Sequence, residues 1–404
     1  MNQTTRYLQH LDTAQFEIAT LVNYLILDAV ALKASDIHIE PWESTLAVRV
    51  RLSGVLQELV HLPLDLMDKV AGRFKVMASL VSYQTFLPQE GHAPASPEFG
   101  GVELRISVFP TVRGEKIVVR LFDPSNRSFD LAQLGFEGET LRQLLHLITR
   151  PNGLILLTGP TGSGKTTAIY AALCHLVQLH GPAISLATVE DPVEFHLPMI
   201  SQAQVNSARE FTYPIALRSL MRQDPQVIMI GEIRDPETAF IAVQAGLTGH
   251  LVISTIHAGS TAGVFARLIN MSIEPFLLAS SLSGALGLRL MRRNCPYCAE
   301  PYVPEPAVLR YLPAEMAEQA SFRRGAGCKE CVGTGFAGRT ALSELLVVDD
   351  AIREAILQKV PTRALQDVAI QRGMTTLWQN GLQRIHQGET PVEEILRIVG
   401  AERL

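Results

Sequence analysis

The spacing of apolar side chains divides the chain into two parts with different predicted architectures. In the first part, residues 16–32 carry apolar side chains three and four positions apart, which predicts an amphipathic helix on a core. Residues 36–40 then alternate between apolar and polar, as in a half-buried strand. The elements expected next are strands at 45–52 and 55–62, a helix at 66–80, a loop at 88–101, and strands at 102–109 and 115–122. Together they predict a small α+β domain.

The second part follows a polar segment, residues 123–128, that has the composition of an interdomain linker. Beyond it, helix-period segments alternate with short apolar runs, a pattern typical of a parallel sheet covered by helices. The expected strands are 154–157, 183–189, 227–230 and 251–254. Amphipathic stretches between residues 350 and 399 predict a helical C-terminal region.

Composition adds little to this picture but excludes some classes of protein. With 47% hydrophobic and 19% charged residues, the 404-residue chain has the composition of a globular protein of two or three domains. Its net charge of −5 gives no reason to expect direct nucleic-acid binding. No apolar run reaches the roughly 18 residues of a membrane span, and the N-terminus lacks the features of a signal peptide. We expect a cytoplasmic protein whose membrane contact is peripheral and made through a partner.

A glycine-rich turn between the run 154–157 and a predicted helix has the sequence of a P-loop. It comprises Gly159, Pro160, Thr161, Gly162, Ser163, Gly164, Lys165, Thr166 and Thr167. Glycines allow the backbone N–H groups to curl around a phosphate. We expect Lys165 to neutralise the β- and γ-phosphates and the Thr166 hydroxyl to bind Mg²⁺. The alternative is a chance glycine-rich turn, but such a turn need not follow an apolar strand and precede a helix, as this one does.

Two acidic residues and a histidine follow the other predicted strands. Glu232 ends the apolar run 227–230 as in a Walker B segment, and we expect it to polarise the attacking water. Glu190 follows the run 183–189 and is expected to assist metal or water placement, because parallel strands converge at their carboxyl ends. The alternative is that one or both cap helices. His257 follows the last run, where a γ-phosphate sensor would lie; the alternative is an ordinary polar residue.

Four of the five cysteines form two C-x-x-C pairs, Cys295 with Cys298 and Cys328 with Cys331. Four thiolates on two short knuckles suit a closed tetrahedral Zn²⁺ site with a structural role. A zinc ribbon that reads nucleic acid is the alternative, but interleaved aromatic residues are missing. Cys174 is expected to be a buried small apolar residue.

These segments together resemble the secretion ATPase superfamily, which includes the type II secretion ATPases (general secretion pathway protein E) and the type IV pilus assembly ATPases. The resemblance extends from about residue 17 to near the end of the chain. It rests on the segment 34–41, the P-loop, the acidic segment 188–194, the segment 231–239, the histidine-containing segment 249–257 and the two cysteine pairs. It implies an α/β fold with a RecA-like P-loop ATPase domain, a smaller N-terminal PAS-like α+β domain and a zinc-binding tetracysteine insertion.

The resemblance also implies domain limits and further site residues. The limits expected are residues 1–122 for the N-terminal helix and PAS-like domain, 123–130 for the linker, 131–291 for the ATPase core, 292–340 for the tetracysteine subdomain and 341–404 for the C-terminal helical subdomain. Arg218 and Arg222 match family arginines that stabilise the γ-phosphate, and Arg105 matches one from the N-terminal domain. His92 stands where the family usually has arginine, so hydrolysis is expected to be slower or pH-sensitive.

The function implied is that of a Mg-ATP-hydrolysing homo-hexamer at the cytoplasmic face of the inner membrane, working on a membrane platform protein to power pseudopilus or type IV pilus assembly. The cysteine pairs favour an assembly or secretion ATPase over a retraction motor. An ATP-binding oligomeric scaffold with little turnover stays open as an alternative, as does a DNA-translocating relative. Type II ATPases usually have a further N-terminal domain, and we expect either a naturally short relative or a trimmed chain.

Overall fold

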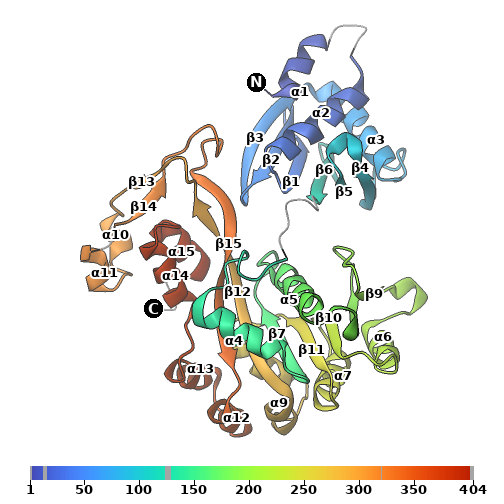
Figure 1. The fold of residues 1–404 in the computed structure, drawn as a ribbon. Helices are drawn as coiled ribbons and strands as arrows, with labels where there is room; N and C mark the ends of the chain where they lie inside the picture. Colours follow the sequence, from blue (N-terminus) through green and yellow to red (C-terminus); the bar gives the residue numbers. More distant parts are fainter. Residues whose placement is uncertain (1, 12–15, 123–128, 320, 401–404) are drawn as a thin grey trace. The chain divides into compact units, whose positions relative to one another are not determined.

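The computed structural model describes residues 2–11, 16–122, 129–319 and 321–400. The chain forms two compact units, Met1–Arg127 and Ser128–Leu404 (Figure 1). The predicted linker, residues 123–130, lies mostly outside the described residues, since 123–128 are not among them.

The first unit is an antiparallel sheet covered by helices. Its six strands lie in the order β3-β2-β1-β6-β5-β4. The helices are α1 (Gln3–Tyr7), α2 (Ile18–Ala31) and α3 (Met67–Met77), and the strands are β1 (Asp36–Pro41), β2 (Leu46–Leu52), β3 (Val55–Leu62), β4 (Gln89–Ser96), β5 (Val102–Thr111) and β6 (Gly114–Phe122). The apolar side of α2, including Leu21 and Leu25, is fully buried in the core of this unit. The helix expected at 16–32 is therefore confirmed.

The loop expected at 88–101 is wrong for most of its length, because it contains strand β4 and a short 3-10 helix, Pro97–Phe99. β4 lies at the edge of the sheet and, among the described strands, pairs with β5 alone. Edge strands tolerate proline, which cannot donate a ladder hydrogen bond. Pro94 and Gly91 thus made a strand look like a turn-rich loop.

The second unit is built on a seven-stranded sheet in the order β15-β12-β7-β11-β10-β8-β9. All its neighbouring strands are parallel except β12 and β15, which are antiparallel. The strands are β7 (Gly153–Thr158), β8 (Leu186–Glu190), β9 (Ser201–Gln204), β10 (Val227–Ile233), β11 (Leu251–Ile256), β12 (Leu282–Asn294) and β15 (Phe336–Val347); β13 (Ala299–Pro301) and β14 (Arg323–Gly325) form a separate hairpin-like pair. The expected, mostly parallel sheet is confirmed.

Helices cover both faces of this sheet. Alternate residues of β7 point to opposite faces: Leu154 and Leu156 pack with α7 and α9, whereas Ile155 and Leu157 pack with α4 and α5. β7 is consequently buried on both sides, which explains its unbroken apolar sequence. The helices are α4 (Gly138–Ile148), α5 (Lys165–His180), α6 (Tyr213–Leu220), α7 (Pro236–Leu247), α8 (Gly263–Asn270), α9 (Pro275–Ser281), α10 (Pro306–Leu309), α11 (Ala314–Gln319), α12 (Asp350–Leu357), α13 (Thr362–Gln371), α14 (Leu377–His386) and α15 (Val392–Val399).

Two of the expected domain limits fall inside strands of this sheet. The limit between residues 291 and 292 lies within β12, and the limit between 340 and 341 lies within β15. The two strands pair along most of their length, so the segment that carries the cysteines leaves and re-enters the main sheet. The C-terminal region is helical from α12 onwards.

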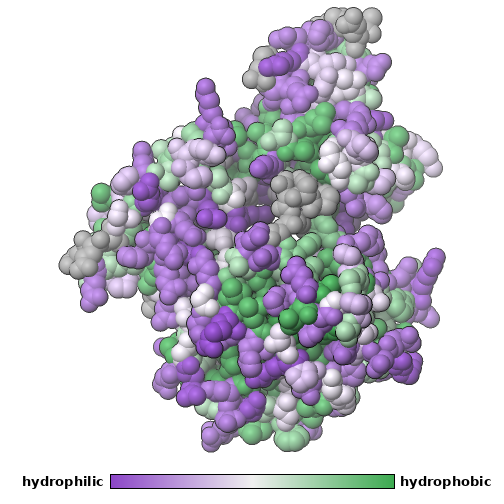
Figure 2. Space-filling model, in the orientation of Figure 1, coloured by the Kyte–Doolittle hydropathy of each residue, from purple (hydrophilic) through white to green (hydrophobic). Residues whose placement is uncertain are grey.

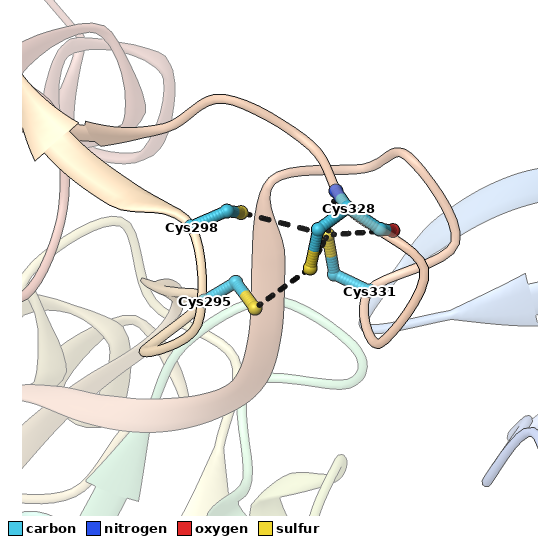
Figure 3. Close-up of side chains that lie close together, drawn as sticks. All are labelled: Cys295, Cys298, Cys328 and Cys331. Carbon is cyan, nitrogen blue, oxygen red and sulfur yellow. Dashed lines mark hydrogen bonds between the residues drawn. The ribbon is translucent and has the colours of Figure 1, made fainter.

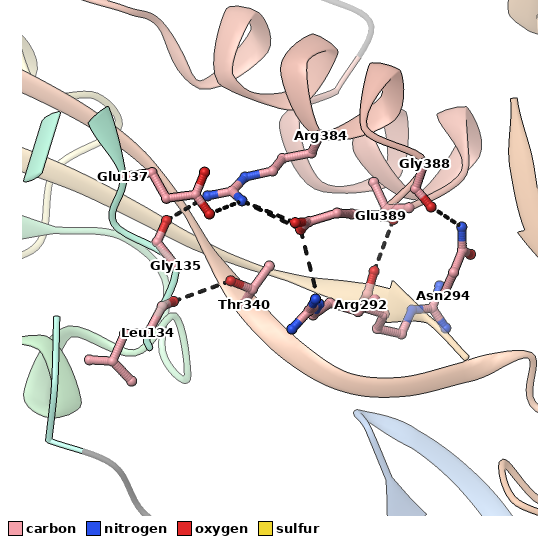
Figure 4. Close-up of polar contacts among 11 residues, drawn as sticks. Leu134, Gly135, Glu137, Arg292, Asn294, Thr340, Arg384, Gly388 and Glu389 are labelled. Carbon is pink, nitrogen blue, oxygen red and sulfur yellow. Dashed lines mark hydrogen bonds and ion pairs between the residues drawn. The ribbon is translucent and has the colours of Figure 1, made fainter. Parts of the chain in front are cut away.

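Buried polar contacts attach the C-terminal helices to the start of the second unit (Figure 4). Arg384 on α14 is only 3% exposed and donates to a Glu137 carboxylate oxygen at 2.7 Å and to the Gly135 carbonyl oxygen at 2.5 Å. Thr340 on β15 donates to the Leu134 carbonyl oxygen at 3.3 Å in the same place. These contacts join α14, β15 and the segment that precedes α4.

Hydrophilic and hydrophobic residues are interspersed over the visible face of each unit (Figure 2). Among the residues that the structure describes, no helix combines the length and the apolar character that crossing a membrane requires.

Candidate active site

The P-loop connects the end of β7 to the start of α5, as its sequence predicts. Gly162 and Gly164 have φ angles of 75° and 90°, in the left-handed region that glycine adopts without strain. A Cβ atom at Gly159 would lie 2.5 Å from the Leu288 carbonyl oxygen, so only glycine fits there. Ser163 is buried, and its Oγ has no hydrogen-bond partner among the described residues. A turn with this shape and a spare hydroxyl fits a phosphate group.

Lys165 begins α5 and folds back over the loop. Its Nζ donates to the carbonyl oxygens of Gly159 and Pro160, at 2.7 and 3.0 Å. Burial lowers the pKa of Lys165; the carboxylate of Glu232 opposes this shift, and the charge of Arg289 adds to it. Both charged residues therefore lie close enough to act on the lysine.

Glu232 lies near the carboxyl end of β10 and faces the lysine side of the loop. Its carboxylate contacts the Arg234 guanidinium and lies 3.7 Å from Nε2 of His257, which follows β11. The Thr255 hydroxyl on β11 donates to the Gly231 carbonyl oxygen at 2.8 Å and fixes the two strand ends to each other. The parallel sheet thus brings Lys165, Glu232 and His257 together, since β7, β10 and β11 all end at one edge of it.

A surface depression of about 410 Å³ opens beside these residues. It is lined by Gly159, Pro160, His257, Ala258, Gly259 and Arg289. Thr158, at the end of β7, donates to the Ala258 carbonyl oxygen at 3.0 Å and accepts from the Ala258 N–H at 3.1 Å. This reciprocal pair fixes the loop after β11 against the P-loop. Sequence reasoning missed the role of Thr158, which only the strand order reveals.

Glu190 has surroundings unlike those of Glu232. Its side chain is buried and accepts hydrogen bonds from the Tyr170 hydroxyl, from Thr188 Oγ1 at 2.6 Å and from Gln202 Nε2 at 3.1 Å. Burial raises the pKa of the Tyr170 phenol, and its hydrogen bond to Glu190 raises that pKa further. Both carboxylate oxygens of Glu190 are therefore engaged within the protein.

Tyr213, at the start of α6, is a residue near the site that sequence reasoning did not find. Its hydroxyl is buried without a hydrogen-bond partner among the described residues, and a Cβ atom at Gly231 would lie 2.6 Å from it. Burial raises the pKa of Tyr213, and the carboxylate of Glu232 raises it further. The sequence around Tyr213 has no motif that marks it as a site residue.

The two expected arginines of the second unit do not line the depression. Arg218 on α6 is half-exposed and pairs with Glu237 at 2.5 Å, and Arg222 is exposed just beyond the end of α6. Arg105 belongs to the first unit, where it lies on β5 opposite His92 on β4 and over the ring of Phe122. Within the second unit, the loop, Lys165, Glu232 and His257 come together, whereas the carboxylate of Glu190 is engaged by other residues and Arg218 pairs with Glu237.

The four cysteines form one cluster between β12 and β15 (Figure 3). Cys295 and Cys298 come from one loop, and Cys328 and Cys331 come from another. The Sγ atoms of Cys295 and Cys328 are 3.9 Å apart, those of Cys298 and Cys331 3.8 Å, and those of Cys328 and Cys331 3.7 Å. A tetrahedral zinc with Zn–S bonds of about 2.3 Å requires sulfurs about 3.8 Å apart, so the cluster has suitable dimensions. Cys174 lies outside it, partly buried on α5.

Known proteins match nearly the whole chain. A family model described as type II/IV secretion system protein matches residues 12–397. The type IV pilus assembly ATPase PilB of Myxococcus xanthus is 41% identical over 392 residues, which cover 96% of this chain and 68% of that protein. The type II secretion system ATPase E of Vibrio cholerae is 42% identical over 383 residues, covering 94% and 75%.

Solved structures agree on the fold. The ATPase DotB of Legionella pneumophila superimposes with a TM-score of 0.70 at 18% identity and covers 95% of this chain and 96% of its own. The pilus retraction motor PilT with bound ADP superimposes with a TM-score of 0.63 at 25% identity, covering 93% and 96%. Because the family model covers more than nine-tenths of the chain and the relatives exceed 40% identity, the chain belongs to the type II/IV secretion system protein family.

Proposed function

We propose that this chain forms a hexameric motor at the cytoplasmic face of the inner membrane, where it acts on a platform protein of the machinery. The chain is an ATPase, and the motor powers pseudopilus or type IV pilus assembly, as its relatives' names indicate. The observation that carries this function is the convergence of Lys165, Glu232 and His257 beside one P-loop. We propose that the first unit is PAS-like, since the family resemblance implies it.

Each residue of the site has a proposed role in hydrolysis. The N–H groups of the P-loop and the Lys165 ammonium hold the phosphates of ATP. Glu232 orients the attacking water and accepts its proton, and His257 contacts the carboxylate of Glu232 from the adjoining strand. Thr166, the first residue after Lys165, would hold Mg²⁺, which neutralises charge on the phosphates when bound.

We assign Glu190 a supporting role. Its three hydrogen bonds connect β8 with α5 and β9, and Tyr170 also accepts from the Glu194 N–H at 3.3 Å. This network holds the acidic segment 190–194 at the edge of the sheet. Direct contact of Glu190 with metal or water requires that its oxygens exchange these partners.

The exposed arginines are proposed to act between subunits. Arg218 and Arg222 present guanidinium groups on the surface of the second unit, away from their own depression. Such groups are placed to meet the γ-phosphate held by a neighbouring subunit, where developing charge in phosphoryl transfer requires cations. Arg105 is proposed to do the same from the first unit.

Mixed oligomers test this proposal. An Arg222→Ala chain and a Glu232→Gln chain, each inactive by itself, are co-expressed with different tags and purified through both tags. In a ring in which the two kinds of subunit are mixed at random in equal amounts, about a quarter of the interfaces combine an intact Glu232 with an intact Arg222. We therefore expect ATPase activity to return to a substantial fraction of the wild-type rate.

The control replaces one partner with the double variant Arg222→Ala/Glu232→Gln, which can form no intact interface. Its mixtures with either single variant are expected to stay inactive. If the two single variants also stay inactive in doubly tagged oligomers, the proposal that Arg222 acts across a subunit boundary is refuted.

We further propose that the cysteine cluster holds a structural Zn²⁺. The sulfur spacing supports this proposal, as do N–H donors to Cys331 Sγ from Cys328 at 3.1 Å and Gly335 at 3.3 Å. With four sulfur ligands, the ion would leave no open position for chemistry.

A further inference from the structure

β12 brings an arginine to the P-loop from the side opposite β11. In the parallel pairing of β12 with β7, Leu286 lies beside Leu157 and Gly287 beside Thr158. β7 then ends and the P-loop begins, whereas β12 continues for several residues. Arg289, two residues after Gly287, therefore runs alongside Gly159 and Pro160.

Contacts of the loop confirm this position. A Cβ atom at Gly159 would come within 3.3 Å of Nη1 of Arg289, and Nη1 also donates to the Leu288 carbonyl oxygen at 2.9 Å. Arg289 is partly exposed and lines the same depression as His257. On the next residue of the strand, Leu290 lies 3.5 Å from the Cβ position of Gly164, so β12 follows the loop closely.

The other two arginines of this strand lie further along it, away from the P-loop. Arg292 contacts the buried carboxylate of Glu394 at 2.5 Å, and Arg293 lies 4.0 Å from Glu389. Those two contacts attach β12 to the C-terminal helices. Arg289 lies earlier on the strand, beside the turn at Gly159 and Pro160 to which the Lys165 ammonium donates. Two cations converging on one glycine-rich turn are the arrangement that an anionic ligand stabilises.

We propose that Arg289 binds the terminal phosphate of ATP within its own subunit, opposite Lys165 across Gly159 and Pro160. This inference rests on the proposed function of the site. A guanidinium presents a planar fork of N–H donors that matches phosphate oxygens, whereas an ammonium is a single point charge. Lys165 and Arg289 would thus contact the terminal phosphate from two sides, with Glu232 and His257 near the attacking water.

Direct binding measurements test this role without relying on turnover. Wild type, Arg289→Gln and Arg289→Lys are titrated calorimetrically with Mg-ADP and with the magnesium complex of adenylyl imidodiphosphate, an ATP analogue that resists hydrolysis. We expect Arg289→Gln to weaken the ATP analogue by about ten-fold, the value of a charge-assisted hydrogen bond, and to leave ADP unchanged. Arg289→Lys keeps the positive charge but lacks the forked N–H donors of a guanidinium. It is expected to lose a smaller part of the preference for the ATP analogue over ADP.

Two controls separate the outcomes. Arg293→Gln, an exposed arginine of the same strand, is expected to bind both nucleotides like wild type. Lys165→Ala is expected to lose both; if it binds both normally, the proposed nucleotide site itself is refuted. If Lys165→Ala fails to bind but Arg289→Gln weakens both nucleotides equally or neither, the site stands and the role of Arg289 is refuted. If Arg289→Gln unfolds at a lower temperature than wild type, the Arg289→Lys variant is the test instead. A wild-type preference of Arg289→Lys for the ATP analogue over ADP also contradicts the proposal.

Discussion

Glu232 and Glu190 both lie at the carboxyl ends of apolar strands of one sheet, yet their side chains have different environments. Glu232 lies beside Lys165 and His257, whereas Glu190 is enclosed by Tyr170, Thr188 and Gln202. The sequence pattern predicts that both follow strand ends, because it depends on apolar runs. It does not predict which carboxylate is buried, because Tyr170 and Gln202 reach Glu190 from α5 and β9 through tertiary packing.

His92 is the residue at which this chain departs from the family pattern. On the first unit, His92 is exposed on β4 and lies directly opposite Arg105 on β5. A guanidinium at position 92 would stand beside a second guanidinium and supply a permanent charge with two forked donors. We predict that His92→Arg raises the ATPase rate at saturating ATP, by up to about ten-fold, as one charge-assisted contact allows.

The measurement is steady-state phosphate release at pH 7, with His61→Arg as the control. His61 is on β3 at the opposite edge of the same sheet, so its replacement is expected to leave the rate unchanged. An unchanged or lower rate for His92→Arg would count against any phosphate role at this position.

At the scale of elements, β12 connects the two candidate sites of the second unit. Its residues 288–290 lie alongside the P-loop, and Cys295 comes directly after the end of the strand. The sequence pattern does not predict this strand, because the apolar run 275–288 is divided between α9 and β12, and a short apolar run does not distinguish helix from strand. β4 was missed for the different reason that an edge strand accepts proline.

Loss of the proposed zinc is predicted to loosen this part of the sheet. β12 and β15 both continue into the cysteine cluster, and Asn294 donates to the Arg323 and Gly388 carbonyl oxygens at 2.9 and 3.0 Å. We predict one zinc per chain by elemental analysis of the purified protein. Cys298→Ser is expected to lose it and to melt at least about 5 °C lower, since structural zinc contributes directly to folding.

Cys174→Ser serves as the matched control, since Cys174 lies on α5 outside the cluster. It is expected to retain a full equivalent of zinc. A wild-type chain purified without chelators that holds no zinc, or a Cys298→Ser variant that retains it, would contradict the structural zinc site.

At the scale of the whole molecule, the alternation of helices with apolar strands predicts the second unit well, because buried parallel strands have a distinctive sequence. The strand order is less accessible. The antiparallel pair β12 and β15 joins residues far apart in the chain, and neither its register nor Arg384's buried contacts with Gly135 and Glu137 leave a local signal. The ATPase core is therefore predictable from its motifs, whereas the elements that surround it depend on long-range pairing.

The central claim is that the chain hydrolyses ATP through Glu232, and the most direct test compares wild type with Glu232→Gln. ATPase rate, ATP binding and oligomeric state are measured with Mg²⁺ present and zinc retained, with Glu354→Gln on the exposed side of α12 as the control. We predict that wild type and the control turn over as hexamers, whereas Glu232→Gln binds ATP and hydrolyses it at least about a hundred-fold more slowly. Wild-type hydrolysis by Glu232→Gln, or ATP binding without turnover by wild type even with added phospholipid, would contradict the account.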